Sequence, residues 1–129
     1  MNNSDVIVIG SGFAGLMAAL VSAEQKKKVT VLTYGSGTFP LNSGLIDVMG
    51  YGVDGKVVES PAAAYDALPS AHPYKKIGQK SLEKAIDFFL DFSKKAGYAY
   101  TGSLDKQQWV ITAVGTMKPS CLVPVSMRG

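Results

Sequence analysis

Three glycines near the start of the chain have the spacing that allows backbone amides to hold a phosphate group. The segment Gly10-Ser11-Gly12-Phe13-Ala14-Gly15 fits the pattern G-x-G-x-x-G. In that pattern Gly10 allows a tight turn after a strand, Gly12 leaves room for a diphosphate, and Gly15 lets the following helix pack closely. The N–H groups at the start of a helix also attract anions. The spacing predicts a dinucleotide-binding turn, and the alternative is a strand–helix turn that binds nothing.

The elements on either side of these glycines are the ones that the motif requires. Val6-Ile7-Val8-Ile9 is a continuous β-branched block, typical of a parallel strand buried on both faces, and we expect a strand over residues 5–9. Apolar residues then follow at helical spacing and predict a helix over residues 14–25. A second strand is expected over residues 29–33. The fold class is therefore α/β, and these elements form a Rossmann-like FAD/NAD(P)-binding βαβ half.

The end of the second expected strand lacks the acidic residue that binds a ribose in the standard motif. This chain has Thr33 followed by Tyr34, and no Asp or Glu lies between Glu24 and Asp47. A Thr offers a single hydroxyl, so it does not bind two ribose hydroxyls as a carboxylate does. This difference weighs against an NAD site, and an NADP site would want an Arg nearby. We keep an NAD-dependent dehydrogenase as a third hypothesis.

A second candidate for cofactor contacts follows this strand. The segment Thr38-Phe39-Pro40-Leu41-Asn42-Ser43-Gly44 contains small polar residues and a glycine, which would supply hydroxyl and N–H donors to a dinucleotide. The alternative is an ordinary surface loop, and the residues alone leave both open.

Composition excludes several other functions. The 129 residues carry a net charge of +3, and the short lysine runs are typical of solvated surface, so we expect no nucleic-acid binding. One cysteine forms no internal disulfide, and with one histidine it makes no zinc site, so we expect no metal. Residues 6–23 are uncharged, but three glycines interrupt them and an acidic segment precedes them. We therefore expect neither a membrane span nor a signal peptide there.

The remainder of the chain predicts a mixture of short elements. Asp54-Gly55 favours a small hairpin over residues 53–58, and Ser60-Pro61 favours a capped helix that ends near Leu68. A longer helix is expected over residues 79–96, with Gly97 as its stop. Strands are expected over residues 98–101 and 109–112, with one more in the tail from Val114 to Gly129.

Several side chains in this part would suit proton transfer or phosphate binding. His72 would serve as a base, but the interpretation we favour is that it fixes the turn before Pro73. Lys118 would meet a phosphate, but a solvated lysine is the favoured interpretation. Asp47 is expected to bind local backbone N–H groups. No catalytic residue is assigned, and three tyrosines are expected to pack: Tyr74, Tyr98 and Tyr100.

Taken together, these segments resemble a known family. Val6–Leu16 resembles the N-terminus of FAD-dependent oxidoreductases of the fumarate reductase and succinate dehydrogenase type. Later segments, in the same order, resemble the B subunit of anaerobic glycerol-3-phosphate dehydrogenase, and the resemblance covers nearly the whole chain. These segments are Thr33, Asn42-Ser43-Gly44-Leu45-Ile46-Asp47, Ala71-His72-Pro73-Tyr74 and Val114-Gly115-Thr116-Met117-Lys118.

The resemblance implies a flavin, FAD or FMN, and Thr33 is the usual residue at its position in that family. The implied cofactor-binding residues are Gly10, Ser11, Gly12, Phe13, Ala14, Gly15, Thr33, Tyr34, Ser43 and Gly44. The implied reaction is oxidation of sn-glycerol 3-phosphate to dihydroxyacetone phosphate, with electrons passed to a quinone. The implied partners are a catalytic A subunit and an iron–sulfur C subunit. The implied location is the cytoplasm, at the inner face of the cell membrane and bound there only through partners.

Family members are several times longer than this chain. We therefore expect residues 1–52 to form the dinucleotide-binding βαβ unit and residues 53–129 to begin an inserted α+β substrate domain that stops early. The chain then resembles an N-terminal fragment, and we expect it to be inactive alone. The alternative function is a non-catalytic nucleotide-fold module that docks on a larger oxidoreductase subunit, where its open sheet edge is paired.

Overall fold

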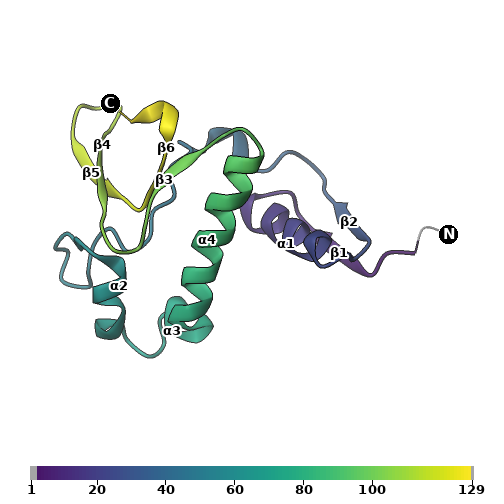
Figure 1. The fold of residues 1–129 in the computed structure, drawn as a ribbon, viewed down its shortest axis with the longest axis horizontal. Coiled ribbons are helices and arrows are strands. Elements are labelled where there is room, and N and C mark those ends of the chain that lie inside the picture. The colour runs from purple at the N-terminus through teal and green to yellow at the C-terminus, as the bar shows by residue number, and fades with distance from the viewer. Residues whose placement is uncertain (1–2, 129) are drawn as a thin grey trace. The chain divides into compact units, whose positions relative to one another are not determined.

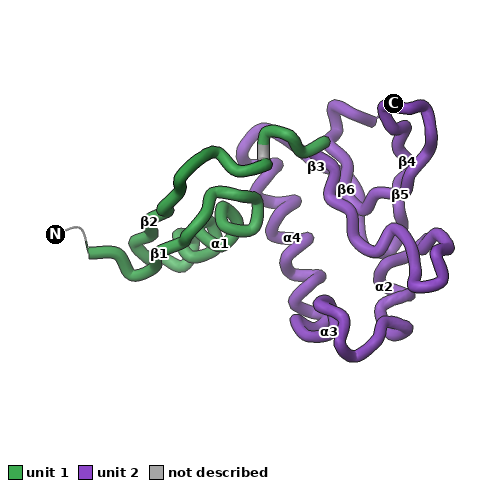
Figure 2. Tube along the Cα trace, turned by 180° about the vertical axis from the view of Figure 1, so that it is seen from behind, with its two compact units in different colours: residues 1–43 green, residues 44–129 purple. Residues whose placement is uncertain are grey.

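The computed structural model describes residues 3–128, which form two compact units (Figure 2). The first unit ends at Ser43 and the second begins at Gly44. We expected the first unit to extend to Gly52. Residues 44–52 instead belong with the second unit, because the backbone of Ile46 pairs with Leu122 and Val48 lies in the core of that unit.

The first unit is a βαβ arrangement (Figure 1). Strand β1 (Val6–Ile9) leads through the glycine turn into helix α1 (Phe13–Glu24), and strand β2 (Val29–Leu32) returns beside β1. The two strands are parallel, in register from Val6 opposite Val29. This confirms the expected strand–helix–strand order, with element ends within one residue of the expected ones. A 3-10 turn over Phe39–Leu41 follows in the connecting loop.

Only one face of the β1–β2 sheet is covered within this unit. Side chains alternate along β1, so that Val6 and Val8 are half-buried while Ile7 and Ile9 are 60% and 86% exposed. Leu32 of β2, which is paired with Ile9, is 52% exposed. The expectation that β1 is buried on both faces is therefore wrong for the first unit by itself. A single helix covers one face of a sheet, and among residues 3–43 there is no second helix of this kind.

The second unit combines short helices with two antiparallel strand pairs. Its helices are α2 (Pro61–Ala64), extended by a 3-10 turn over Tyr65–Ala67, α3 (Pro73–Ile77) and α4 (Gln79–Lys95). Its strands are β3 (Tyr100–Gly102), β4 (Gln108–Ile111), β5 (Met117–Ser120) and β6 (Leu122–Pro124), before a 3-10 turn over Val125–Met127. Strand β3 pairs with β6, and β4 pairs with β5.

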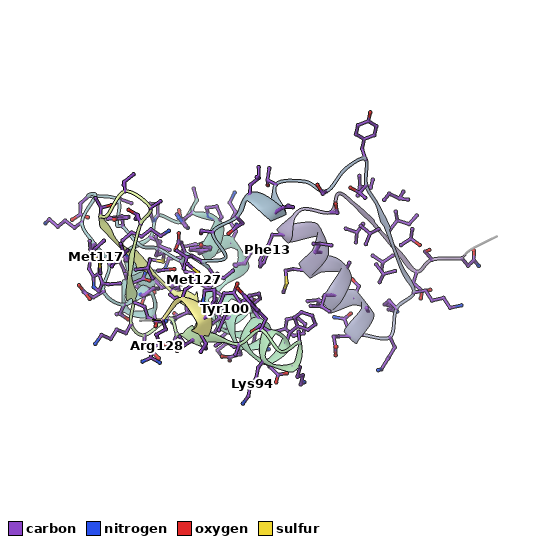
Figure 3. The ribbon with its side chains drawn as sticks, turned by 90° about the horizontal axis from the view of Figure 1, so that it is seen from above. Phe13, Lys94, Tyr100, Met117, Met127 and Arg128 are labelled. Carbon is purple, nitrogen blue, oxygen red and sulfur yellow. The ribbon has the colours of Figure 1, made fainter. Side chains whose placement is uncertain are left out.

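The hydrophobic core of the second unit lies between α4 and β6. Its buried members are Val48, Leu82, Ile86, Leu104, Cys121 and Leu122. Helix α4 buries Leu82 and Ile86, which lie four residues apart and therefore on the same face of the helix. Phe89, one turn further on, meets the ring of Tyr100 edge-on at a centroid distance of 4.8 Å; Tyr100 is labelled in Figure 3.

The ends of the helices follow the predicted signals. The Ser60 hydroxyl accepts a hydrogen bond from the amide of Ala63 at the start of α2. Helix α4 ends in a Schellman motif, in which the amide of Gly97 binds the carbonyl of Lys94 and the amide of Tyr98 binds that of Ser93. Gly97 has the required positive φ of 80°.

Other details differ from expectation. The segment around Asp54-Gly55 forms a turn closed by one bridge between Tyr51 and Val57, and not a regular hairpin. The tail contains two strands, β5 and β6, where one was expected. Helix α3 forms where no helix was expected. Within residues 3–128, none of the helices combines the length and the apolar character that crossing a bilayer requires.

Candidate functional site

The turn between β1 and α1 depends on the conformational freedom of Gly10. Gly10 has φ of 101°, a conformation that side-chain-bearing residues rarely adopt. Its amide donates a 2.8 Å hydrogen bond to the carbonyl of Leu32, so the turn begins where β2 ends. A Cβ built on Gly10 would meet no atom within 4 Å, so open space lies beside the turn.

Gly15 provides the close approach of helix to strand that its position in the motif predicts. A Cβ at this position would overlap the carbonyl oxygen of Gly10 and would lie 3.4 Å from a methyl group of Val8. Only a residue without a side chain therefore allows α1 to pack at its present distance from β1. The first turn of α1 is held against the glycine turn as a result.

Gly12 begins the helix and leaves its amino end accessible. It is the N-cap of α1, its carbonyl accepts from the amide of Leu16 at 2.9 Å, and no side chain caps the helix end. A Cβ on Gly12 would also meet nothing within 4 Å. The first turn of the 12-residue helix contains no acidic residue that would repel an anion. The end of α1 thus fits a diphosphate in both space and charge.

Thr33 makes contacts different from those of a ribose-binding acid. Its hydroxyl lies 2.8 Å from the hydroxyl of Ser11, and both hydroxyls are hydrogen-bonded to the carbonyl oxygen of Gly35. Ser11 and Thr33, both predicted to contact the cofactor, therefore lie side by side. In this structure their hydroxyl groups contact each other. Their hydrogen bonds tie the glycine turn to the loop after β2.

Gly37 is a residue of this site that the sequence motif did not include. It has φ of 64°, and a Cβ there would lie 3.4 Å from the amide nitrogen of Gly12. The loop backbone after β2 thus passes beside the amino end of α1. The sequence does contain a feature that could have identified this loop. It is the pair of glycines in Gly35-Ser36-Gly37, which follows the second strand after Thr33 and Tyr34.

The other predicted cofactor residues have different surroundings. Phe13 is 38% exposed at the start of α1, where Figure 3 labels it, and Ala14 beside it is exposed. The side chain of Tyr34 is fully exposed. Ser43 is the last residue of the first unit, whereas Gly44 belongs to the second unit, where its carbonyl accepts a 2.7 Å hydrogen bond from the Tyr100 hydroxyl.

His72 has the structural role that the sequence favoured. It is the N-cap of α3, and its Nδ1 accepts a hydrogen bond from the amide of Tyr74 at 3.2 Å. Pro73 occupies the first position of the helix, where a missing N–H costs nothing. This cap and the following proline explain why residues 73–77 form a helix.

Asp47 and Lys118 form an ion pair at 2.5 Å that joins the loop after Gly44 to β5. The expectation that Asp47 binds local backbone amides did not include this partner. Lys118, whose side chain remains 31% exposed, is therefore a partly solvated lysine with an acidic partner. The two residues are 71 positions apart, so no local sequence signal revealed the pair.

Burial changes the ionisation of three groups in the second unit. Burial raises the pKa of the Tyr74 hydroxyl, and the nearby Cys121 and Asp47 raise it further. Burial, with a smaller contribution from Tyr98, also raises the pKa of Tyr100. The pKa of the Cys121 thiol rises from 9.0 to about 11, again mainly through burial. Burial of this kind is typical of packing residues, as expected for Tyr74 and Tyr100, whereas Tyr98, which was also expected to pack, is 56% exposed.

No group of three or more His, Cys, Asp or Glu side chains suited to a metal ion occurs in the described part of the chain.

Comparison with known proteins places this geometry in a wider context. The sequence pattern of the FAD binding domain family matches residues 5–128. The B subunit of anaerobic glycerol-3-phosphate dehydrogenase from Vibrio cholerae is 38% identical over 95% of this chain and 29% of its own length. The proteins of the same name from Vibrio vulnificus and Pectobacterium carotovorum are 34% and 28% identical over 95% and 94% of this chain, and over 29% and 30% of their own lengths.

This chain therefore spans about three tenths of the length of the curated relatives that it matches. No solved structure matches it significantly. The predicted resemblance to this B subunit, and to FAD-dependent proteins more generally, is confirmed.

Proposed function

We propose, from the premise that this chain belongs to the FAD-binding domain family, that the amino end of α1 binds the diphosphate of FAD. One observation carries the proposal. The space beside Gly10 and Gly12 is open, while Gly15 holds the uncapped end of α1 against the turn. Backbone amides at such a helix end donate to phosphate oxygens, and the helix dipole adds to the attraction.

The residues around this turn would have different roles in binding FAD. The backbone around Gly12, Phe13 and Ala14 would contact the diphosphate. Ser11 and Thr33, whose hydroxyls are bonded to each other, would hold the turn and the loop after β2 in register. Three further residues remain proposed contacts for other parts of the cofactor: Tyr34, Ser43 and Gly44. Bound flavin supplies an acceptor for the electrons removed from a substrate.

We favour FAD over FMN as the cofactor. The match to an FAD binding domain supports FAD, and the glycine turn is of the kind that accommodates a diphosphate, which FMN lacks. The absence of an acid at Thr33 leaves the adenosine ribose without its usual partner. The same absence weighs against the NAD-dependent dehydrogenase that the sequence left open.

For the whole protein, we propose the reaction suggested by the names of the relatives. A quinone-linked flavoprotein complex would oxidise sn-glycerol 3-phosphate to dihydroxyacetone phosphate, removing two electrons and two protons. Its partners would be a catalytic A subunit and an iron–sulfur C subunit, at the inner face of the cell membrane. The second unit would be the beginning of an inserted domain. We expect residues 1–129 alone not to turn over substrate, since they correspond to only about three tenths of the length of these relatives.

Titration of the 129-residue chain tests the cofactor proposal. Calorimetry with FAD, FMN and ADP should show binding of FAD and ADP, with FMN weaker. Gly12→Val should reduce FAD affinity by about tenfold or more, because its side chain would enter the diphosphate space and block at least one charged hydrogen bond. Ala113→Val is the control, since it places the same side chain at an exposed position of the second unit that none of the proposed cofactor contacts includes. Failure of all three nucleotides to bind would contradict the proposal.

A second candidate function is a docking module that does not take part in catalysis. The exposed apolar side chains of Ile7, Ile9 and Leu32 on the uncovered sheet face favour it. Light scattering of the purified chain, alone and mixed with the proposed partner subunits, each with and without FAD, separates the two functions. A stable complex with another protein of the assembly in the absence of flavin would favour docking, whereas a monomer with bound FAD would favour the cofactor proposal.

A further inference from the structure

We propose that the second unit contains a small-molecule site of its own, which takes a neutral, flat ring compound bearing a hydrogen-bond acceptor. The site is a cavity of about 490 Å³, a size usual for small-molecule pockets. All of its lining residues belong to the second unit, and none belongs to the glycine turn. Its lining residues are Met49, Tyr51, Gly52, Val53, Leu68, His72, Pro73 and Tyr74.

One wall of the cavity is held in a strained conformation. Met49 has φ of 48°, a left-handed conformation that costs a residue with a side chain free energy. The amide nitrogen of the Gln107 side chain, which is 2% exposed, donates to the carbonyl of Val48 at 2.8 Å and lies 3.3 Å from that of Met49. Strain that a buried side chain maintains in this way is concentrated at functional sites in proteins.

The same wall is reinforced by the turn that follows it. The amide of Gly52 donates to the carbonyl of Lys56 at 2.8 Å, and Tyr51 forms a bridge with Val57. Lys56 itself is paired with Asp54 at 3.5 Å. The residues that line this side of the cavity are therefore positioned before any ligand arrives.

The lining segment from His72 to Tyr74 is also fixed by hydrogen bonds. The amide of His72 donates to the carbonyl of Pro69 at 2.9 Å, and the Tyr65 hydroxyl donates to the carbonyl of Tyr74 at 3.1 Å. The ring of Tyr65 in turn lies beneath the ammonium group of Lys75, which pairs with Asp66. A cavity with two fixed walls binds without a large ordering cost.

The tautomer of His72 defines the polar group of the site. Because Nδ1 accepts a hydrogen bond from the amide of Tyr74, it carries no proton, and in the neutral ring the proton lies on Nε2. His72 therefore offers an Nε2–H donor from a residue that lines the cavity. A carbonyl or ether oxygen of a ligand would accept this hydrogen bond.

The apolar and aromatic residues of the lining indicate the chemical class of the ligand. Met49, Leu68 and Pro73 are apolar, Tyr51 and Tyr74 are aromatic, and none of the lining residues carries a full charge at neutral pH when His72 is neutral. Nearby Lys56 and Lys75 are paired with Asp54 and Asp66. A neutral aromatic or heteroaromatic ring suits such a surface better than a phosphate or a sugar.

Two matched probes test the inference on the 129-residue chain, without flavin. One is 2-acetonaphthone, which has a carbonyl acceptor, and the other is 2-ethylnaphthalene, which has the same shape without the acceptor. Titration followed by amide NMR should shift the signals of Tyr51, Gly52 and Tyr74. The ketone should bind roughly fivefold more tightly than the hydrocarbon, as one neutral hydrogen bond predicts.

Variants separate the cavity from other apolar surface. Val53→Trp should fill the mouth and abolish the shifts, whereas Val114→Trp should not, since Val114 is equally exposed (84% against 83%) and does not line the cavity. His72→Ser replaces the capping Nδ1 with a hydroxyl oxygen that still accepts from the helix amide, and it removes the Nε2–H, so it should eliminate the preference for the ketone. Any of three results would overturn the inference. These are amide shifts at residues that do not line the cavity, unchanged binding of the probes in Val53→Trp, and an unchanged preference for the ketone in His72→Ser. Because flavin is absent, failure here leaves the proposed cofactor site untouched.

Discussion

At the scale of single residues, the three motif glycines perform three different physical tasks. Gly10 adopts a positive φ, Gly12 leaves an open space, and Gly15 avoids an overlap with a backbone carbonyl. Their spacing in the sequence predicted all three tasks. The neighbouring Ser11 and Thr33 perform a fourth, since their hydroxyls connect the turn to the loop after β2.

We expect Gly15→Ala to reduce the free energy of unfolding by about 1–3 kcal/mol, the usual cost of overpacking. The added methyl group would overlap the carbonyl oxygen of Gly10, so α1 would have to move away from β1. Urea denaturation followed by circular dichroism measures the loss. Gly35→Ala, where the methyl group enters open space, should change stability little; equal losses in both variants would argue against the close approach.

The buried thiol of Cys121 should make stability fall at high pH. Its pKa is raised to about 11 in the folded protein, above its ordinary value of 9.0, so the folded state retains a proton that the unfolded state has lost. Folding then becomes less favourable as the pH rises from about 9 to about 11. Urea midpoints measured across this range should decline.

The variant Cys121→Ala tests the cause of that decline. It removes the hydrogen bond from the thiol to the carbonyl of Ser103, so it should be less stable at every pH. Its midpoint should nevertheless fall less steeply above pH 9 than that of the original chain. The raised pKa values of Tyr74 and Tyr100 act in the same direction and should leave a smaller residual slope. An identical slope in both proteins would exclude Cys121 as the cause.

At the scale of elements, the ends of helices were easier to predict than the pairing of strands. Ser60-Pro61 marked the correct start of α2 and Gly97 the correct end of α4, because capping depends on residues within a few positions of each other. Helix α3 was missed because its cap is a histidine, which is not among the usual capping residues. The tail was predicted to form one strand but forms two, and the pairing of β6 was not predictable because its partners, β3 and the segment at Ile46, lie far away in the sequence.

We expect Gly97→Ala to destabilise the protein by about 1–2 kcal/mol, the cost of placing a side chain in a left-handed conformation. Gly97 has φ of 80° and a Cβ there meets no other atom, so the cost is conformational rather than steric. Gly97→Asn should lose less, because Asn tolerates this conformation better. Thermal unfolding compares the three proteins, and an Asn variant as unstable as the Ala variant would contradict this explanation.

At the scale of the whole molecule, the two compact units differ in how much they bury. Every side chain that is buried in the core belongs to the second unit, and among residues 3–43 none with a described side chain is buried. The second unit should therefore be the more stable of the two, since apolar burial is the main source of folding free energy. Local stability within one chain commonly varies in this way.

Hydrogen exchange followed by mass spectrometry should show this difference directly. We expect amides of β1, α1 and β2 to exchange faster than those of α4 and β6. Addition of FAD should slow exchange in peptides that contain Gly12 and the first turn of α1, and should leave α4 unchanged. Uniform protection across both units in the absence of FAD would contradict the predicted difference.

The sequence by itself determined the βαβ order, the positions of the three motif glycines, the capped helices α2 and α4 and the family, because each depends on local spacing or on an ordered set of short segments. Only the tertiary structure decided the partner of Thr33, the pair between Asp47 and Lys118, and the unit to which residues 44–52 belong. These features join residues that are distant in sequence. Such contacts depend on how the folded backbone brings segments together, and neither propensity nor periodicity encodes that on its own.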